Sequence, residues 1–280
     1  MSEDLARSPA PTPTHIVFSQ SSLNDYVDCA RRFQLRYVLE QQWPAVESEP
    51  LIERERQADL GRRFHRLIQQ HVHGLPVEGL ARSASADTDL VRWWQSYLAF
   101  EAGGERPGAV ALPSQRRAEV ALSVAFGSHR LAAQYDLLAM DEQRAVIVDW
   151  KTERKRPDRS TLLRRLQTRV YRYVLAKSNP LLAPESISMV YWFAEFPAEP
   201  EVLTYDSAQS ADDEISLHQL LSEIEQRQGA VWPLTADERR CRFCTYRSLC
   251  ERGVRAGVAE PDDADVPLEI DLEEIDEIAY

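Results

Sequence analysis

The sequence predicts an α/β fold in which a mixed sheet is flanked by helices, and three observations support this prediction. The apolar run at 145–152 has the length and composition of a strand that is buried on both faces. Residues 129–140 form a second apolar run, and the short polar stretch 141–144 between the two runs predicts an antiparallel hairpin. Helical spacing at 160–177 precedes another apolar run at 186–196, so strands alternate with helices along the chain.

Further elements are expected before and after this hairpin. Residues 118–126 alternate between apolar and polar side chains, as a half-buried strand does. In residues 17–39, Ser21 or Ser22 can cap a first helix, and Cys29 lies between two helical pieces. Apolar residues at helical spacing predict three more helices, at 53–73, 86–100 and 211–228.

Length and composition favour one large domain at 15–255. A chain of 280 residues with 44% apolar content can bury a sizeable core. It has no apolar run near the roughly 18 residues of a membrane helix, and its N-terminus lacks the apolar region of a signal peptide. We therefore expect a soluble cytoplasmic protein with no membrane contact and a disordered N-terminus at 1–14, where prolines recur.

The negative charge is concentrated in an acidic tail at 256–280. Its ten acids, which all lie in 260–280 with no Lys or Arg between them, account for ten of the twelve net negative charges. Such a run is typical of a disordered, solubilising tail. Aliphatic residues among the acids also allow two other interpretations, which are docking on a protein partner and folding back on the basic helix in imitation of DNA.

Basic residues cluster in 153–173, directly after the buried strand. Eight Lys or Arg residues stand against two acids in this stretch, which is the charge pattern that a phosphate backbone requires. A solvated helix face would show the same pattern. Seven of the eight are the candidate nucleic-acid contacts: Arg154, Lys155, Arg156, Arg164, Arg165, Arg169 and Arg172.

Asp149 and Lys151 stand two positions apart at the end of the buried strand. A strand has a period of two residues, so both side chains leave the same face about 7 Å apart. A surface ion pair would have the same spacing. A functional site is favoured because the charges follow a buried run, and because Lys151 is one of only three lysines in a chain that otherwise uses Arg.

The predicted hairpin places a second acid beside Asp149. If Met140 faces Ala145 across the four-residue loop, then Asp136 faces Asp149 on the neighbouring strand. Cross-strand partners have Cβ atoms about 5 Å apart, so the two carboxylates would repel each other. A bound divalent cation that prefers oxygen ligands resolves such repulsion, and the sequence therefore predicts a Mg²⁺ or Mn²⁺ site.

This arrangement of an Asp on one strand and Asp-x-Lys on the next resembles the PD-(D/E)XK nuclease superfamily. The resemblance covers residues 17–252 and is closest to the RecB-like iron–sulfur branch, which includes the AddB nuclease domain and the CRISPR-associated iron–sulfur exonucleases. It implies a restriction-endonuclease-like core. The N-terminal pattern of serines, Tyr26, Cys29 and Phe33 is similar to that branch, although Ala30 stands where proline is usual.

The resemblance also implies roles for individual residues. His65, preceded one turn earlier by Gly61, would be a metal ligand, although a lone histidine at a helix edge is also commonly structural, and His71 is expected in the core. Glu119 stands where the family often has a further acid. The metal ligands would be His65, Asp136, Asp149 and the carbonyl of Trp150, and the catalytic set would be Asp136, Asp149, Lys151, Gln167 and Tyr171.

The four cysteines suggest a second metal centre. Cys241, Cys244 and Cys250 follow the pattern C-x2-C-x5-C, and Cys29 lies far upstream. Two disulfides are not expected in a cytoplasmic protein, whereas four thiolates suit either Zn²⁺ or a [4Fe-4S] cluster. The resemblance favours the iron–sulfur cluster, in a subdomain that joins residues 17–40 to 235–252.

Together these features predict a metal-dependent DNA nuclease. The resemblance implies an exonuclease that acts on single-stranded DNA or DNA ends, in repair, recombination or CRISPR adaptation. The alternative is a catalytically silent DNA-binding or scaffolding subunit with the same fold. The facing carboxylates beside Lys151 favour the enzyme, because a binding module has no need of them.

Overall fold

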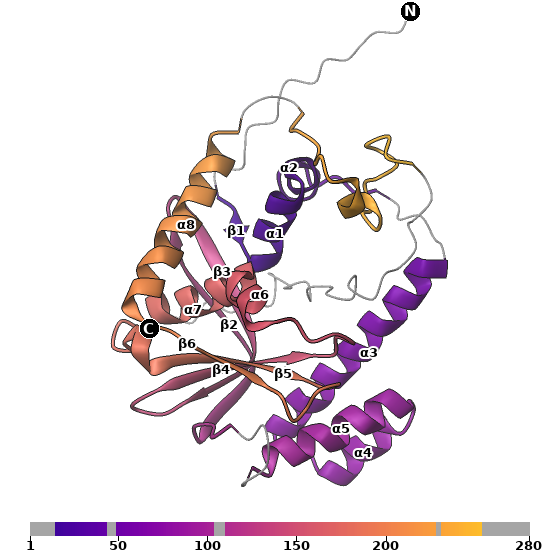
Figure 1. The fold of residues 1–280 in the computed structure, drawn as a ribbon, viewed down its shortest axis with the longest axis vertical. Coiled ribbons are helices and arrows are strands. Elements are labelled where there is room, and N and C mark those ends of the chain that lie inside the picture. The colour runs from indigo at the N-terminus through magenta and orange to yellow at the C-terminus, as the bar shows by residue number, and fades with distance from the viewer. Residues whose placement is uncertain (1–14, 44–48, 104–109, 228–230, 254–280) are drawn as a thin grey trace, which may run out of the picture.

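The fold is built on a six-stranded mixed sheet, which is shown in the computed structural model in Figure 1. The structure describes residues 15–43, 49–103, 110–227 and 231–253; the expected N-terminal disorder and the acidic tail lie outside these residues. The strand order is β1-β3-β4-β5-β6, with β2 paired to β3. The strands are β1 (Val17–Phe18), β2 (Gln115–Phe126), β3 (His129–Met140), β4 (Ala145–Lys151), β5 (Ile187–Phe193) and β6 (Glu201–Thr204).

The sheet is mixed because a hairpin and a helical crossover meet at β4. Strands β3 and β4 are antiparallel, whereas β4 and β5 are parallel. The predicted hairpin register is confirmed, since Met140 pairs with Ala145 and Leu137 with Val148. The antiparallel pairing of β3 with β4 ends at the pair Leu137–Val148, next to Asp136. The two strands therefore separate at the position where the sequence predicts two facing carboxylates.

Helices cover both faces of the sheet, as Figure 1 shows. On one face, a core rich in tryptophan joins Val146, Val148 and Trp150 to helices α3, α4 and α5. On the other face, Ile147 and Met189 pack in a core that includes residues of α1, α7 and α8. The helices are α1 (Gln20–Asp28), α2 (Ala30–Phe33), α3 (Glu49–Val72), α4 (Val77–Ala84), α5 (Thr88–Glu101), α6 (Arg159–Arg164), α7 (Leu166–Ser178) and α8 (Ser207–Glu225). This arrangement confirms the α/β fold with a mixed sheet flanked by helices.

Two local predictions about helices are wrong. The first helix is capped by Ser19 rather than by Ser21 or Ser22, because the Ser19 hydroxyl accepts from the Ser22 amide while the Ser22 hydroxyl accepts from the Ser19 amide. The helix expected at 160–177 is two helices, α6 and α7. Between them Arg165 is extended, with ψ 134°.

The break at Arg165 is stabilised by a side chain from the next turn. The Thr168 hydroxyl donates to the Leu162 carbonyl at 2.6 Å, which satisfies a carbonyl at the end of α6. The same hydroxyl lies 2.7 Å from the Tyr191 hydroxyl of β5. Three elements are not predicted from the sequence. Strands β1 and β6 are too short to show a periodic pattern, and the third is helix α4.

The two ends of the described chain pack together. Trp232 stacks on Phe33 with ring centroids 5.9 Å apart, and its backbone N–H donates to Gln34. The Tyr246 hydroxyl donates to the carbonyl of Gln41. Residues 231–253 therefore lie against the N-terminal helices, where α1, α2 and a π-helical turn, η1 (Gln34–Val38), follow one another.

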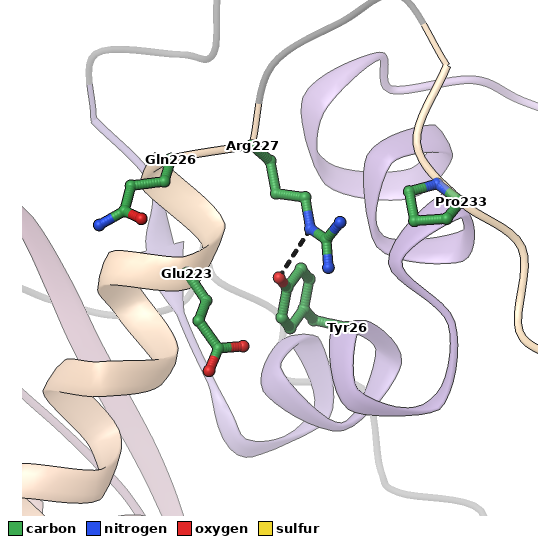
Figure 2. Close-up of a pocket in the computed structure, with 5 residues that line it drawn as sticks. All are labelled: Tyr26, Glu223, Gln226, Arg227 and Pro233. Carbon is green, nitrogen blue, oxygen red and sulfur yellow. Dashed lines mark hydrogen bonds between the residues drawn. The ribbon is translucent and has the colours of Figure 1, made fainter.

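A cavity of about 430 Å³ lies where the end of α8 approaches α1 (Figure 2). Arg227 projects across it, donates to the Tyr26 hydroxyl at 2.9 Å and lies over the Tyr26 ring. Glu223, Gln226 and Pro233 complete its lining. This contact ties the last helix of the domain to the first. No described helix is long and apolar enough to span a membrane.

Candidate active site

The candidate site lies at the carboxyl end of β4, where Asp149 is buried with 1% of its surface exposed. One carboxylate oxygen, Oδ1, accepts a hydrogen bond from the Gln167 amide at 2.7 Å. The other, Oδ2, lies 3.1 Å from the Lys151 ammonium. The structure thus brings three of the predicted catalytic residues, from β4 and the first turn of α7, into one cluster.

Lys151 lies on the same face of β4 as Asp149, as the strand period predicts. Its ammonium is 5.9 Å from the centroid of the Tyr191 ring, which is buried on the adjacent strand β5. Tyr191 pairs with Asp149 in the parallel register of β4 and β5. Sequence reasoning did not select Tyr191, although the apolar run containing it predicted a neighbouring buried strand.

Asp136 is held by groups around Trp150. Its Oδ2 atom accepts the Trp150 backbone N–H at 2.8 Å, and its Oδ1 atom lies 3.4 Å from Nδ1 of His65. The other ring nitrogen of His65, Nε2, is 3.0 Å from the Trp150 carbonyl oxygen. Asp136, His65 and the Trp150 carbonyl therefore form one continuous group.

The approach of α3 to β4 depends on Gly61. A Cβ atom at this position would lie 3.2 Å from Oγ1 of Thr152, the residue directly after β4. Glycine removes that contact and lets the helix lie close enough for His65, one turn later, to reach Trp150. His71, further along α3, lies away from the site. Its Nδ1 atom is 2.9 Å from the Tyr97 hydroxyl, as expected for a structural histidine.

Glu119 also belongs to this group. It lies on β2 between Ala118 and Val120, which pair with Leu137 and Tyr135, so it is placed opposite Asp136. Its φ of 53° is unusual for a residue other than glycine, and such backbone strain is concentrated at functional sites. The short turn after Phe126 is the feature of the sequence that could have located Glu119. It sets the register of β2 against β3, and this register places Glu119 opposite Asp136.

Three side chains in the described part of the chain form a group suited to a metal ion. One ligand atom from each of His65, Glu119 and Asp136 lies within 4.8 Å of the others. Asp149 lies outside this group of three. Nδ1 of His65 and Oδ2 of Asp149 are buried and have ion-pair contacts, to Asp136 and Lys151, in place of hydrogen bonds within the described residues. Carboxylates with one imidazole suit a divalent cation such as Mg²⁺ or Mn²⁺.

The charges in the site are strongly coupled. Burial, followed by the Asp136 charge, raises the pKa of Glu119 to about 7. Burial also raises the pKa of Asp149 to about 7, although Lys151 opposes the increase. Burial disfavours the charged form of His65, but Asp136 and the other acids more than offset this and raise its pKa to about 9. A cation at this position would relieve the repulsion among the acids.

Gln167 and Tyr171 both face the site from α7. Gln167 orients Asp149 through the hydrogen bond described above. Tyr171 is buried, and its pKa is raised well above its usual range by burial and then by the charge of Asp149. Its backbone carbonyl accepts a hydrogen bond from the Tyr135 hydroxyl at 3.0 Å. The helix is therefore anchored to β3 as well as to β4.

The basic residues of 153–173 do not form one exposed surface. Arg172 is buried, lies 4.4 Å from the centroid of the Tyr205 ring and pairs with Asp213, so its prediction as a nucleic-acid contact on the solvent-facing arc is wrong. Arg169 bonds both Asp212 and Asp213 at 2.6 Å, which joins α7 to α8. The sequence could not reveal this because α8 covers that side of α7 only in the folded protein.

The other five predicted contacts are either paired with an acid or exposed. Arg156 pairs with Glu201 at 2.7 Å, and Arg165 pairs with Glu153 at 3.1 Å. Three more are exposed: Arg154, Lys155 and Arg164. Exposed positive charge therefore follows β4 directly at Arg154 and Lys155. These two residues are the members of the basic cluster 153–173, called the basic stripe below, that stand nearest to Lys151 in the sequence.

The four cysteines are free thiols from opposite ends of the sequence. Burial raises the pKa of Cys241 and Cys250, and the neighbouring Cys29 thiolate raises both further. Burial likewise raises the pKa of Cys244. The thiols are therefore close enough to interact electrostatically. Within the described ranges, however, no three sulfur atoms lie within 4.8 Å of one another.

Comparisons with known proteins identify a family for this chain. The sequence matches the profile of the PD-(D/E)XK nuclease superfamily over residues 17–251. No curated protein matches it. Among solved structures, a proposed exonuclease from Eubacterium rectale is similar with a TM-score of 0.48 and 11% identity, over 90% of this chain and 94% of the other. The protein SSO0001 is similar with a TM-score of 0.31 and 14% identity, over 48% of this chain and 59% of the other.

Proposed function

Because the chain belongs to the PD-(D/E)XK nuclease superfamily, whose members hydrolyse phosphodiester bonds with divalent metals, we propose that it is a DNA exonuclease acting on single strands or DNA ends. The observation that carries this proposal is the cluster of Asp149, Lys151 and Gln167 at the end of β4. Its neighbours His65, Glu119 and Asp136 supply the group suited to a metal ion. Repair, recombination and CRISPR adaptation are the processes that use such an activity.

The metal site would be formed by Glu119, Asp136 and His65, with Asp149 and the Trp150 carbonyl beside them. The chemistry that Mg²⁺ or Mn²⁺ supplies in a nuclease is activation of water and neutralisation of charge on the phosphoryl oxygens. The donor set supports this assignment, because two carboxylates and one imidazole with ligand atoms within 4.8 Å of one another suit a divalent cation.

Lys151 is the residue that the geometry best suits to act on the phosphate. Its ammonium is held by Asp149 and lies beside the Tyr191 ring, so it is oriented before substrate arrives. A fixed positive charge in a site of low dielectric stabilises negative charge that develops in the transition state. Gln167 holds Asp149 from the other side and so fixes the position of the ion pair.

We assign the four cysteines to an iron–sulfur cluster, with zinc as the alternative. Tetrahedral zinc with bonds of about 2.3 Å would require sulfur atoms about 3.8 Å apart. No three cysteine sulfurs in the described chain are that close. In a [4Fe-4S] cluster each thiolate binds a different corner, so the sulfurs lie further apart. Burial raises the pKa of Cys241, Cys244 and Cys250 by more than the nearby Arg31, Arg32 and Arg252 lower it, so a bound metal would supply the charge that keeps these thiols deprotonated.

The test is cleavage of end-labelled single- and double-stranded DNA by anaerobically purified protein with Mn²⁺. We expect Asp149→Ala and Lys151→Ala each to reduce cleavage by at least about a thousandfold, because each removes a charge that acts in the transition state. Lys177→Ala is the matched control, since Lys177 is paired with Glu214 on the surface. Wild-type activity in a folded Lys151→Ala protein would show that Lys151 has no catalytic role, whereas a wild-type protein that binds DNA and does not cleave it would be a binding module.

A further inference from the structure

Arg165 and Glu153 form an ion pair beside the candidate site. Arg165 is the single extended residue between α6 and α7, and Glu153 is two residues beyond Lys151 at the end of β4. Two guanidinium nitrogens of Arg165 lie 3.1 and 3.4 Å from the two carboxylate oxygens of Glu153. The side chains are 19% and 11% exposed, so solvent and ligands can still reach the pair.

The pair is fixed beside the catalytic lysine by one aromatic ring. The Arg165 guanidinium is 6.0 Å from the centroid of Tyr191, and the Lys151 ammonium is 5.9 Å from the same centroid. The Tyr191 ring is itself fixed, because it is buried and its hydroxyl is 2.7 Å from that of Thr168. Two cations therefore share one rigid support at the carboxyl ends of β4 and β5.

This position distinguishes Arg165 from the other paired arginines of the basic stripe. Arg169 and Arg172 join α7 to α8 through Asp213, and Arg156 joins its loop to Glu201 of β6. These pairs connect packed elements. The Arg165–Glu153 pair instead lies between the strand end that carries Lys151 and the break before Gln167. A phosphate held by Lys151 would lie in the same part of the site as Arg165, because both cations lie about 6 Å from the Tyr191 ring centroid.

We propose that Glu153 occupies, in the DNA-free protein, the place that a phosphate of the DNA backbone takes on Arg165. A carboxylate and a phosphate both accept the same two parallel N–H donors of a guanidinium, so one can replace the other. Arg165 is then a positioning residue for the phosphate beside the scissile bond, and Glu153 is an internal competitor that weakens binding of anions. This inference rests on the proposed function in assuming DNA as the substrate.

The inference is tested by DNA binding without cleavage. The probe is a fluorescein-labelled single-stranded oligonucleotide with Ca²⁺ in place of Mn²⁺, and the readout is anisotropy over a range of salt concentrations. We expect Glu153→Gln to tighten binding by about fivefold and Arg165→Ala to weaken it by about tenfold. Loss of one phosphate contact should also reduce the slope of log K against log salt by about 0.7. Arg165→Lys should restore little, because it lacks the planar fork.

Two controls separate displacement of Glu153 from a general effect of charge. Asp212→Asn removes the same charge from another arginine partner on an exposed helix face and should change binding less than twofold. In an Arg165→Ala background, Glu153→Gln should no longer tighten binding. Tightening that persists in that background, or Glu153→Gln binding within twofold of wild type, would overturn the inference.

The outcomes also separate this inference from the proposed function. If the wild-type protein cleaves DNA and the Arg165→Ala and Glu153→Gln variants bind DNA as it does, only the role of Arg165 and Glu153 is rejected. Binding that responds as expected, in a protein that cleaves no DNA with Mn²⁺ or Mg²⁺, would reject the nuclease activity and retain the phosphate contact. Failure of the wild-type protein to bind DNA at low salt would overturn both.

Discussion

Gly61 is the residue on which the position of His65 depends. Its neighbour across the contact is Thr152, directly after the strand that carries Asp149 and Lys151. The distance of 3.2 Å from a Cβ at Gly61 to Oγ1 of Thr152 is tighter than ordinary contact, so a methyl group here must move α3 or the loop by a few tenths of an ångström. Small displacements of catalytic groups are costly to rate, since reaction requires near-attack geometry.

We therefore expect Gly61→Ala to lower kcat/KM for DNA cleavage by about tenfold while leaving the protein folded. The measurements are Mn²⁺-dependent cleavage and the thermal midpoint. Gly79→Ala is the matched control, because its Cβ would lie 3.9 Å from the end of the Arg82 side chain, in ordinary contact. Adding Thr152→Ala should recover part of the lost activity. If Gly61→Ala cleaves DNA as well as wild type, the close approach of α3 is unimportant for the site.

At the scale of elements, the break between α6 and α7 determines where the polar residues of α7 point. Leu166 begins α7 after the extended Arg165, and Gln167 in the first turn reaches Asp149. If the helix continued through Arg165, α7 would share the axis of α6 and could not turn independently toward β4. The Thr168 hydroxyl stabilises the break by bonding the Leu162 carbonyl, and it also contacts the Tyr191 hydroxyl under Lys151.

Thr168→Val is expected to lower the free energy of unfolding by about 1–3 kcal/mol, because it leaves a buried carbonyl and a buried phenol with one partner fewer. Urea unfolding measures the change. Thr161→Val, at a partly exposed position in α6, should cost less than about 0.5 kcal/mol. Equal stability of the two variants would show that the hydroxyl of Thr168 does not hold the break.

At the scale of the whole molecule, the two ends of the described chain pack against each other. Trp232 and Tyr246 contact the N-terminal helices, and Cys29 lies within electrostatic reach of Cys241 and Cys250. Residues between Cys29 and Cys241 include all the strands from β2 to β6. A cluster bound by these thiolates would therefore close a very long loop, and crosslinks of that kind restrict the unfolded chain strongly.

The protein purified without oxygen is expected to contain iron and to absorb broadly near roughly 400 nm, as thiolate-bound iron clusters do. Cys250→Ser should reduce both the iron content and the thermal midpoint, since loop closure of this length contributes up to about 5 kcal/mol. Elemental analysis and thermal unfolding measure these changes. One zinc and no iron per chain would contradict the cluster assignment.

Much of the fold and part of the site follow from local pattern. The period of two residues places Asp149 and Lys151 on one face of β4, and a four-residue loop sets the register of β3 against β4. Gln167 is indicated by the resemblance to the nuclease family rather than by helical spacing alone, and neither indicates the break at Arg165. The strand period and the hairpin register depend only on residues close together in the sequence, which is why they can be predicted without a structure.

The tertiary structure alone decided the remaining features, because they depend on contacts between distant segments. Asp136 leaves the ladder and bonds the Trp150 amide, while Glu119 joins it from β2 through an unusual backbone conformation. Packing of α8 on α7 buries Arg172 in a face that the sequence alone presents as solvent-exposed. A sequence pattern gives the direction of a side chain from its own element, but burial and ionic partners are set by whichever element packs against it.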